Sequence, residues 1–297
     1  MHVRGKTMTK VRVSAVQIKC SSNVNENIKK ADEAARRAAA EGARIILLPE
    51  LFERQYFCQE RRYDYYGFAM PVKENDAVKH FICVSEELKA VIPVSFYEKD
   101  GNTLYNSVAV IDCGKLLGVY RKTHIPDDHY YQEKFYFTPG NTGFKVWDTT
   151  YGRIGVAICW DQWFPEAARS MALMGAQILL YPTAIGSEPI LGVDSRDHWT
   201  RTMQGHAAAN VIPVIAANRT GTERVEPCAE NGGQRSELKF YGSSFITDET
   251  GKILSECSRD NEQIISEEFD FQEIDEERLG WGLFRDRRPG CYGELVK

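Results

Sequence analysis

Two kinds of hydrophobic pattern alternate at the start of the chain. The run VRVSAVQ, residues 11–17, is apolar enough for a buried strand. In the next segment the apolar residues recur at helical spacing, with Asn23 placed as an N-cap and Gly42 as a stop. ARIILLPE, residues 43–50, has no polar face and predicts a second strand that is buried on both sides.

The pattern changes in the middle of the chain and then starts again. AVIPVSFYE, LYNSVAVID and KLLGVYRKT are strand-like runs separated by the turn signals KDGN and CGK, which predict an antiparallel meander. YGRIGVAICW then predicts a strand, and FPEAARSMALMG predicts a helix with Pro165 in its first turn and Gly175 past its end. The strand-like run AQILLYPT follows, and further strands are expected in NVIPVIAANRTG, KFYGSSFITDETGKIL and QIISEEFDF.

The two halves of the chain resemble each other. EGARIILLPE, residues 41–50, is echoed by MGAQILLYPT, residues 174–183, and an Ala-rich helix and a strand precede each of them. We interpret this as an internal duplication of a strand–helix–strand unit, which predicts an α/β fold with helices outside two facing sheets. Without any linker-like segment, we expect one domain over 8–297. Residues 1–7 would be an added or disordered N-terminus, and about 280–297 a C-terminal extension.

Composition excludes several classes of function. The net charge is −5 and no long Lys/Arg block occurs, so binding to nucleic acid or to a membrane surface is not expected. No apolar run reaches the ~20 residues of a membrane span, and the start lacks the apolar core of a secretory signal, which predicts a cytoplasmic protein. The eight cysteines include no CxxC pair and no His cluster, so no metal site is expected.

Cys159 departs from the default of a reduced, inert thiol. It ends a predicted strand and stands just before Trp160, Asp161 and a predicted helix, where α/β proteins expose reactive groups. A thiol with its ordinary pKa of about 8.5 is mostly protonated at neutral pH, so a nucleophilic cysteine needs a base or a cation beside it. A buried structural thiol is the alternative interpretation.

Three charged residues could supply that chemistry. Glu50 follows an apolar strand and would be partly desolvated, which suits a general base. Lys122 ends another strand-like run and could place an ammonium beside an oxyanion, while Glu133 stands among aromatic residues. Each of the three could equally be a solvated surface side chain. No GxSxG motif supports a serine nucleophile, and no histidine is needed as the base.

The motifs LLPELF, YRKTHIPD and GVAICWDQWFPEAARSMALMGAQILLYPTAIGSEP resemble the nitrilase (carbon–nitrogen hydrolase) superfamily. The resemblance covers essentially the whole chain and implies a four-layer α-β-β-α sandwich. It also implies that Cys159 is the nucleophile and Glu50 the general base. Lys122 and the backbone N–H of Trp160 would stabilise the tetrahedral intermediate, and Glu133 matches a second acid beside the lysine.

The resemblance further implies hydrolysis through a thioester, without metal or cofactor. It also implies a homo-oligomer, with the C-terminal FRDRRPGCYGELVK near an interface or the pocket rim. A catalytically silent binding or assembly protein is the rival class, and the intact Glu, Lys and Cys set argues against it.

The loop after the nucleophile bears on the substrate. Relatives that act on carbamoyl amino acids carry arginines there to hold a carboxylate, whereas this chain has Gln162 and Trp163. We therefore expect a small cationic ureido substrate, with another ω-amide or an N-carbamoyl amine or amino acid as the alternative. We predict Glu188 as the contact of the substrate amine. Asp194 and Asp197 could serve too, although a loop cap or an ion pair with Arg196 is expected of both.

Overall fold

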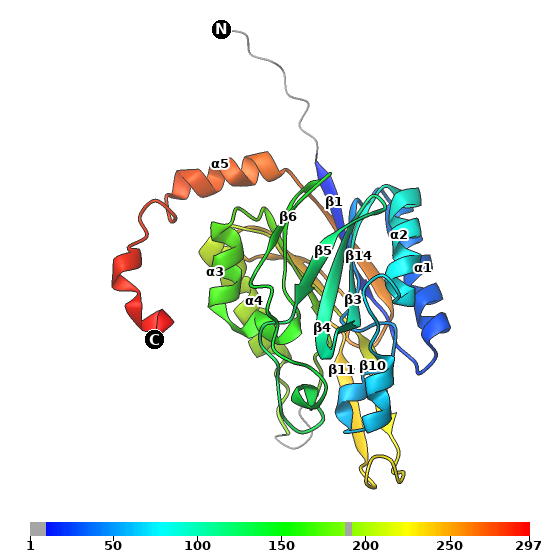
Figure 1. Ribbon diagram of the computed structural model, residues 1–297. Coiled ribbons are helices and arrows are strands. Elements are labelled where there is room, and N and C mark those ends of the chain that lie inside the picture. The colour runs from blue at the N-terminus through cyan, green and yellow to red at the C-terminus, as the bar shows by residue number, and fades with distance from the viewer. Residues whose placement is uncertain (1–9, 188–191) are drawn as a thin grey trace.

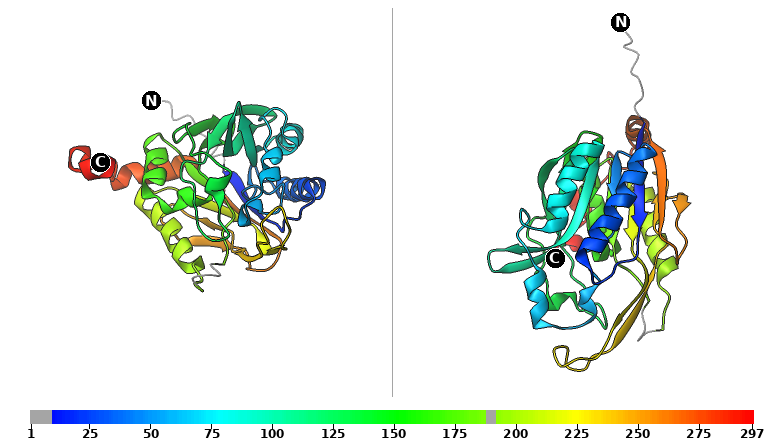
Figure 2. Two further views of the ribbon diagram at one scale, coloured as in Figure 1. Left: turned by 60° about the horizontal axis from the view of Figure 1, so that its bottom comes forward. Right: turned by 90° about the vertical axis from the view of Figure 1, so that its right-hand side faces the viewer.

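Two six-stranded sheets lie face to face, with helices on the outer side of each, in the computed structural model (Figures 1 and 2). The structure describes residues 10–187 and 192–297. The first sheet has the order β14-β1-β2-β3-β4-β5. Its strands are β1 (Val11–Gln17), β2 (Ile45–Leu47), β3 (Val91–Asp100), β4 (Thr103–Asp112), β5 (Lys115–Arg121) and β14 (Gln263–Phe269).

The second sheet has the order β13-β12-β9-β8-β7-β6. Its strands are β6 (Val146–Thr149), β7 (Gly152–Val156), β8 (Ile178–Thr183), β9 (Val214–Asn218), β12 (Phe245–Thr247) and β13 (Ile253–Glu256). A separate hairpin is formed by β10 (Thr220–Val225) and β11 (Ser236–Tyr241). The helices are α1 (Val24–Ala40), α2 (Asp76–Leu88), α3 (Pro165–Leu173), α4 (Arg196–Asn210) and α5 (Phe271–Trp281). Short 3₁₀ turns are η1 (Phe57–Gln59), η2 (Tyr63–Phe68), η3 (Glu133–Phe135), η4 (Cys159–Trp163), η5 (Pro289–Cys291) and η6 (Gly293–Val296).

The internal duplication extends further than the sequence pattern predicted. In one half β1, β2 and β3 are parallel and are connected through α1 and α2. In the other half β7, β8 and β9 are parallel and are connected through α3 and α4. Each unit continues into two antiparallel strands and is bordered on its other edge by one more. The predicted α-β-β-α sandwich is therefore confirmed.

The cores explain why the predicted strands lack a polar face. In β2 and the residue after it, Ile45 and Leu47 lie in the core between the two sheets, while Ile46 and Leu48 lie in the core under α1 and α2. All four side chains are fully buried. Burying one aliphatic side chain stabilises the fold by about 1.5–3 kcal/mol. A strand with apolar side chains on both faces is therefore most stable between two apolar layers.

Capping and turn residues in the sequence predicted several of the boundaries of helices and strands. The Asn23 side chain caps α1 by accepting a hydrogen bond from the backbone N–H of Glu26, as predicted. The predicted strand over 151–160 is shorter in the structure: β7 ends at Val156, and Cys159 begins the turn η4. The helices α2 and α4 were not anticipated.

The C-terminal segment leaves the body of the molecule. α5 and the residues after it extend past the sandwich beside α3 (Figure 1). This segment exposes several large apolar side chains, namely Leu279, Trp281, Leu295 and Val296. Among the described residues, no helix is long and apolar enough to cross a membrane.

Candidate active site

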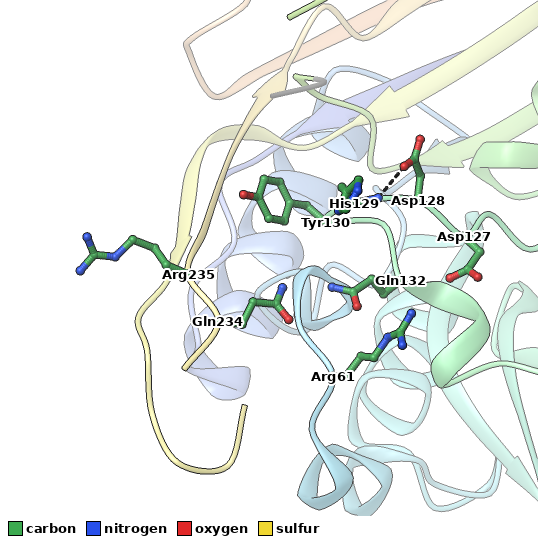
Figure 3. A pocket seen from close by; sticks show the side chains of 8 residues that line it. All are labelled: Arg61, Asp127, Asp128, His129, Tyr130, Gln132, Gln234 and Arg235. Atoms are coloured by element: carbon green, nitrogen blue, oxygen red, sulfur yellow. Dashed lines mark hydrogen bonds between the residues drawn. The ribbon is translucent and has the colours of Figure 1, made fainter. Parts of the chain in front are cut away.

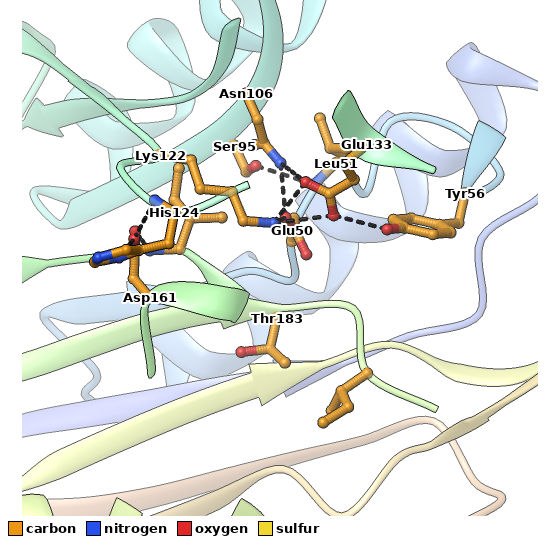
Figure 4. Close-up of polar contacts among 12 residues, drawn as sticks. Glu50, Leu51, Tyr56, Ser95, Asn106, Lys122, His124, Glu133, Asp161 and Thr183 are labelled. Atoms are coloured by element: carbon orange, nitrogen blue, oxygen red, sulfur yellow. Dashed lines mark hydrogen bonds and ion pairs between the residues drawn. The ribbon is translucent and has the colours of Figure 1, made fainter. Parts of the chain in front are cut away.

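The residues that the sequence singled out follow three different strands and converge at one place. Figure 4 shows Glu50, Lys122 and Glu133 there, and Cys159 lines the same pocket as Glu133. Glu50 follows β2, Lys122 comes directly after β5, and Cys159 follows β7. The Lys122 ammonium lies 2.8 Å from Glu50 Oε1 and 2.7 Å from Glu133 Oε2. All four side chains are buried, and Cys159, at 7% exposure, is the most accessible of them. The structure thus brings these four predicted residues together.

The Lys122 side chain lies between two carboxylates, and all three side chains are buried. Burial opposes its charge, but the negative charges of Glu133 and Glu50 outweigh burial and hold the pKa of Lys122 well above its ordinary value. Burial also raises the pKa of Glu133, and the Lys122 charge acts against that shift. Asn106 Nδ2 donates to Glu50 Oε1 at 2.7 Å, and the Tyr56 hydroxyl donates to Glu133 Oε1 at 2.7 Å.

Cys159 stands on a strained turn. Its backbone φ of 41° is in the left-handed region, which a residue with a Cβ rarely adopts. The carboxylate of Asp161 holds this turn, because its Oδ2 accepts from the backbone N–H of Ile158 and from the Tyr120 hydroxyl. Its Oδ1 accepts from the backbone N–H of His124 at 2.9 Å. Strain of this kind persists only where the surroundings determine it, which is typical of functional sites.

The thiol of Cys159 holds a proton, and the neighbouring Glu50 has an oxygen that can accept one. Burial, and then the negative charge of Glu50, raise the pKa of Cys159 well above its ordinary value, so the resting sulfur is a protonated thiol. A hydrogen bond from the backbone of Ala184 acts in the opposite direction. Glu50 Oε1 is occupied by Lys122 and Asn106, whereas its buried Oε2 has no hydrogen-bond partner among the described residues. This oxygen is available to take a proton.

The turn that carries Glu50 is fixed from the other half of the chain. The Arg219 guanidinium, fully buried at the end of β9, donates to the backbone carbonyls of Glu50 at 2.7 Å and Leu51 at 3.0 Å. Its charge is balanced by Glu223 at 2.8 Å. Leu51 has a φ of 47°, so the residue next to Glu50 is also in the left-handed region.

A pocket of about 170 Å³ opens at the sulfur. We call it the inner pocket, and it is lined by Pro126, Asp127, Asp128, Tyr131, Glu133, Cys159, Trp160, Trp163, Ala184 and Ile185. Among the described residues, this lining contains three carboxylates and no lysine or arginine. Its volume suits a small linear substrate, because pockets for drug-sized ligands are larger, about 300–1,000 Å³. In residues 10–187 and 192–297, no group of three or more His, Cys, Asp or Glu is placed to hold a metal ion.

The other positions that the sequence singled out do not all lie at the inner pocket. Trp160 and Trp163 line the inner pocket, but Gln162 is buried and accepts hydrogen bonds from the indole of Trp199 at 2.8 Å and from the hydroxyl of Thr183. Glu188 lies outside the described residues.

The two aspartates of the following loop are used in ion pairs. Asp194 pairs with Arg259 at 2.7 Å and accepts from the backbone N–H of Arg196. Asp197 pairs with Arg196 at 2.7 Å. Asp197 thus forms the ion pair with Arg196 that the sequence suggested, whereas Asp194 caps the backbone of Arg196 but pairs with Arg259. Neither aspartate is among the described residues that line the inner pocket.

Sequence reasoning missed the residues that support the cluster. Asn106, Asp161 and Arg219 are polar or charged, yet each is completely buried. Asn106 interrupts the apolar run LYNSVAVID and Arg219 follows the apolar run VIAAN. A buried polar side chain in such a run requires partners, and that was the available signal.

The comparisons agree with this fold. Residues 12–278 match the model of the carbon–nitrogen hydrolase family, and the chain belongs to that family. A crystal structure of a carbon–nitrogen hydrolase from Helicobacter pylori superposes with a TM-score of 0.87 at 34% identity, covering 97% of this chain and 99% of that one.

Two similar proteins have curated names. The chain is 52% identical to an N-carbamoylputrescine amidase of Arabidopsis thaliana, over 96% of this chain and 95% of that one. It is 51% identical to a citrullinase of Francisella tularensis, over 98% of this chain and 99% of that one.

Proposed function

We propose that this chain hydrolyses N-carbamoylputrescine to putrescine, carbon dioxide and ammonia. The observation that carries the proposal is the buried cluster of Cys159, Glu50 and Lys122 at the base of a small pocket, whose described lining has acidic residues and no lysine or arginine. The 52% identity to a plant N-carbamoylputrescine amidase over nearly the whole chain supports the choice of substrate.

The first half-reaction forms a thioester. Glu50 Oε2 takes the thiol proton, and Cys159 Sγ attacks the ureido carbon. Negative charge then develops on the ureido oxygen, where the Lys122 ammonium and the backbone N–H of Trp160 stabilise it. A single donor of this kind contributes about 3 kcal/mol to the transition state. The bond to the terminal nitrogen breaks, Glu50 returns the proton to it, and ammonia leaves a carbamoyl group on the sulfur.

The second half-reaction releases the amine. Glu50 takes a proton from water, and the hydroxide attacks the thioester carbon. The carbon–sulfur bond breaks, the thiol regains its proton, and a carbamic acid leaves, which decomposes to putrescine and carbon dioxide. The groups that take part are side chains and one backbone N–H of this protein, together with water.

We also propose that the protein is a cytoplasmic homo-oligomer of one catalytic domain. The exposed apolar side chains of the C-terminal segment, Trp281 and Leu295 among them, support the assembly, since a second copy can cover them. Light scattering at micromolar concentration tests this, and a stable monomer would contradict it.

The substrate is tested by ammonia release from N-carbamoylputrescine and from citrulline under the same conditions. We expect kcat/KM to be higher for N-carbamoylputrescine, because the described lining of the inner pocket has no lysine or arginine to receive a carboxylate. A preference for citrulline would overturn the proposal.

A further inference from the structure

The far end of the substrate needs a partner in the protein. N-carbamoylputrescine ends in an ammonium group, and the inner pocket offers the carboxylates of Asp127, Asp128 and Glu133 as described candidates. Asking which of them binds the ammonium rests on the proposed function and deepens it.

Two of the three carboxylates already have partners. Glu133 accepts hydrogen bonds from Lys122 and from the Tyr56 hydroxyl, and it belongs to the catalytic cluster. Asp128 Oδ1 accepts from the backbone N–H of His129 at 2.7 Å, and the backbone of Asp128 is bridged to that of Tyr131 in both directions. Asp128 therefore shapes the turn.

Asp127 is different, because its carboxylate has no hydrogen-bond or ion-pair partner within residues 10–187 and 192–297. It is an exposed residue next to Pro126, which is buried and lines the same pocket. An ionised carboxylate without a partner beside a small pocket is suited to bind a cation from the substrate.

The position of Asp127 agrees with the far end of a linear substrate. A second, outer cavity of about 480 Å³ is lined by Arg61, Asp127, Asp128, His129, Tyr130, Gln132, Gln234 and Arg235 (Figure 3). Asp127 and Asp128 line both cavities, whereas Cys159 lines the inner pocket alone. The two aspartates thus mark the opening of the inner pocket, and a chain that starts at the sulfur and runs outward reaches them.

The cations of the outer cavity leave Asp127 unpaired. Arg235 forms an ion pair with Glu226 at 3.3 Å. Arg61 and Asp127 both line the outer cavity (Figure 3), but the two side chains form no ion pair among the described residues.

We propose that Asp127 receives the substrate ammonium and sets the preference for a cationic ureide. The indole rings of Trp160 and Trp163, whose centroids lie 6.2 Å apart, line the apolar part of the path that the methylene chain follows. A carboxylate at the far end meets Asp127 as a like charge and is rejected.

The test compares three ureides that share a four-carbon chain, in wild type and in Asp127→Asn. They are N-carbamoylputrescine, the neutral N-butylurea and 5-ureidopentanoate, whose far end is a carboxylate. We expect kcat/KM for N-carbamoylputrescine to fall roughly 10- to 100-fold, mostly through KM, since one charge-assisted hydrogen bond is lost. We expect a far smaller change for N-butylurea and a gain for 5-ureidopentanoate.

Two further variants make the assignment specific. Asp128→Asn removes a neighbouring charge of the same sign, and we expect it to lower kcat/KM for N-carbamoylputrescine much less than Asp127→Asn does. Glu188→Gln removes the carboxylate that the sequence suggested. The assignment would be overturned if Asp127→Asn lowered kcat/KM for N-butylurea as much as for N-carbamoylputrescine. It would also be overturned if the preference for a cationic ureide changed in Glu188→Gln or Asp128→Asn and not in Asp127→Asn. Failure of wild type to hydrolyse N-carbamoylputrescine would refute the proposed function and is a separate result.

Discussion

Replacing Glu50 by Gln tests the proton transfer with little change of shape. Glu50 Oε1 accepts from Lys122 at 2.8 Å and from Asn106 at 2.7 Å, and the amide oxygen of Gln can keep both contacts. Oε2, which has no partner among the described residues, becomes an NH₂ group that cannot take a proton. A positioned general base contributes a factor of about 10²–10⁴, so we expect kcat to fall by that factor. This corresponds to about 3–5 kcal/mol in the barrier.

The assay is the steady-state release of ammonia, with thermal unfolding of each variant measured in parallel. Glu53→Gln is the matched control, because Glu53 is also buried in this loop but contacts Asn75 and Arg54 rather than Lys122. We expect Glu53→Gln to lower stability while each folded molecule keeps its turnover. A Glu50→Gln enzyme that is fully folded and retains more than a tenth of wild-type kcat would refute the role of Glu50 as base.

Three more variants probe the site and its supports. Cys159→Ala should abolish the release of ammonia and keep the fold, and thermal unfolding measured beside the assay checks the second point. Glu133→Gln should lower kcat roughly 10²-fold with a smaller change in KM, since the Lys122 charge loses one of its two counter-ions. Burial lowers the pKa of His206 below its ordinary 6.5. The unfolded chain therefore binds a proton at this histidine more readily than the folded one, and the free energy of unfolding falls as pH falls through 6.5. Denaturation of His206→Gln should show a smaller loss of this free energy between pH 7 and pH 5 than wild type.

The sequence predicted the fold through its apolar runs and its internal repeat. β2 and β8 are short strands covered on both faces, so their sequences show no alternation and their pairing is not visible locally. The repeat supplied that information, because two similar strand–helix–strand units predict two similar layers. α4 was missed because its first turns, RDHWTRTMQ, are largely polar, although Trp199 and Met203 in them are completely buried.

The candidate site was predictable only in part. Glu50, Lys122 and Cys159 follow apolar runs, and strand ends are where such side chains gather. Contacts that decide the geometry join residues far apart in the sequence: Arg219 reaches the carbonyl of Glu50 across 169 positions. The left-handed backbone of Cys159 carries no signal of its own in the sequence, since glycine is the residue that usually marks such a conformation.

The proposed reaction also explains why Lys122 has two carboxylates when one could balance its charge. In each half-reaction Glu50 becomes neutral as it takes a proton, and at that moment it no longer balances the ammonium. Lys122 is completely buried, and a buried charge without a partner costs several kcal/mol. Glu133, with both oxygens within 3.0 Å of Lys122 Nζ, keeps the ammonium paired and therefore charged while the oxyanion forms. Glu133 acts in this way through Lys122, as a positioning residue for the cation that the transition state requires.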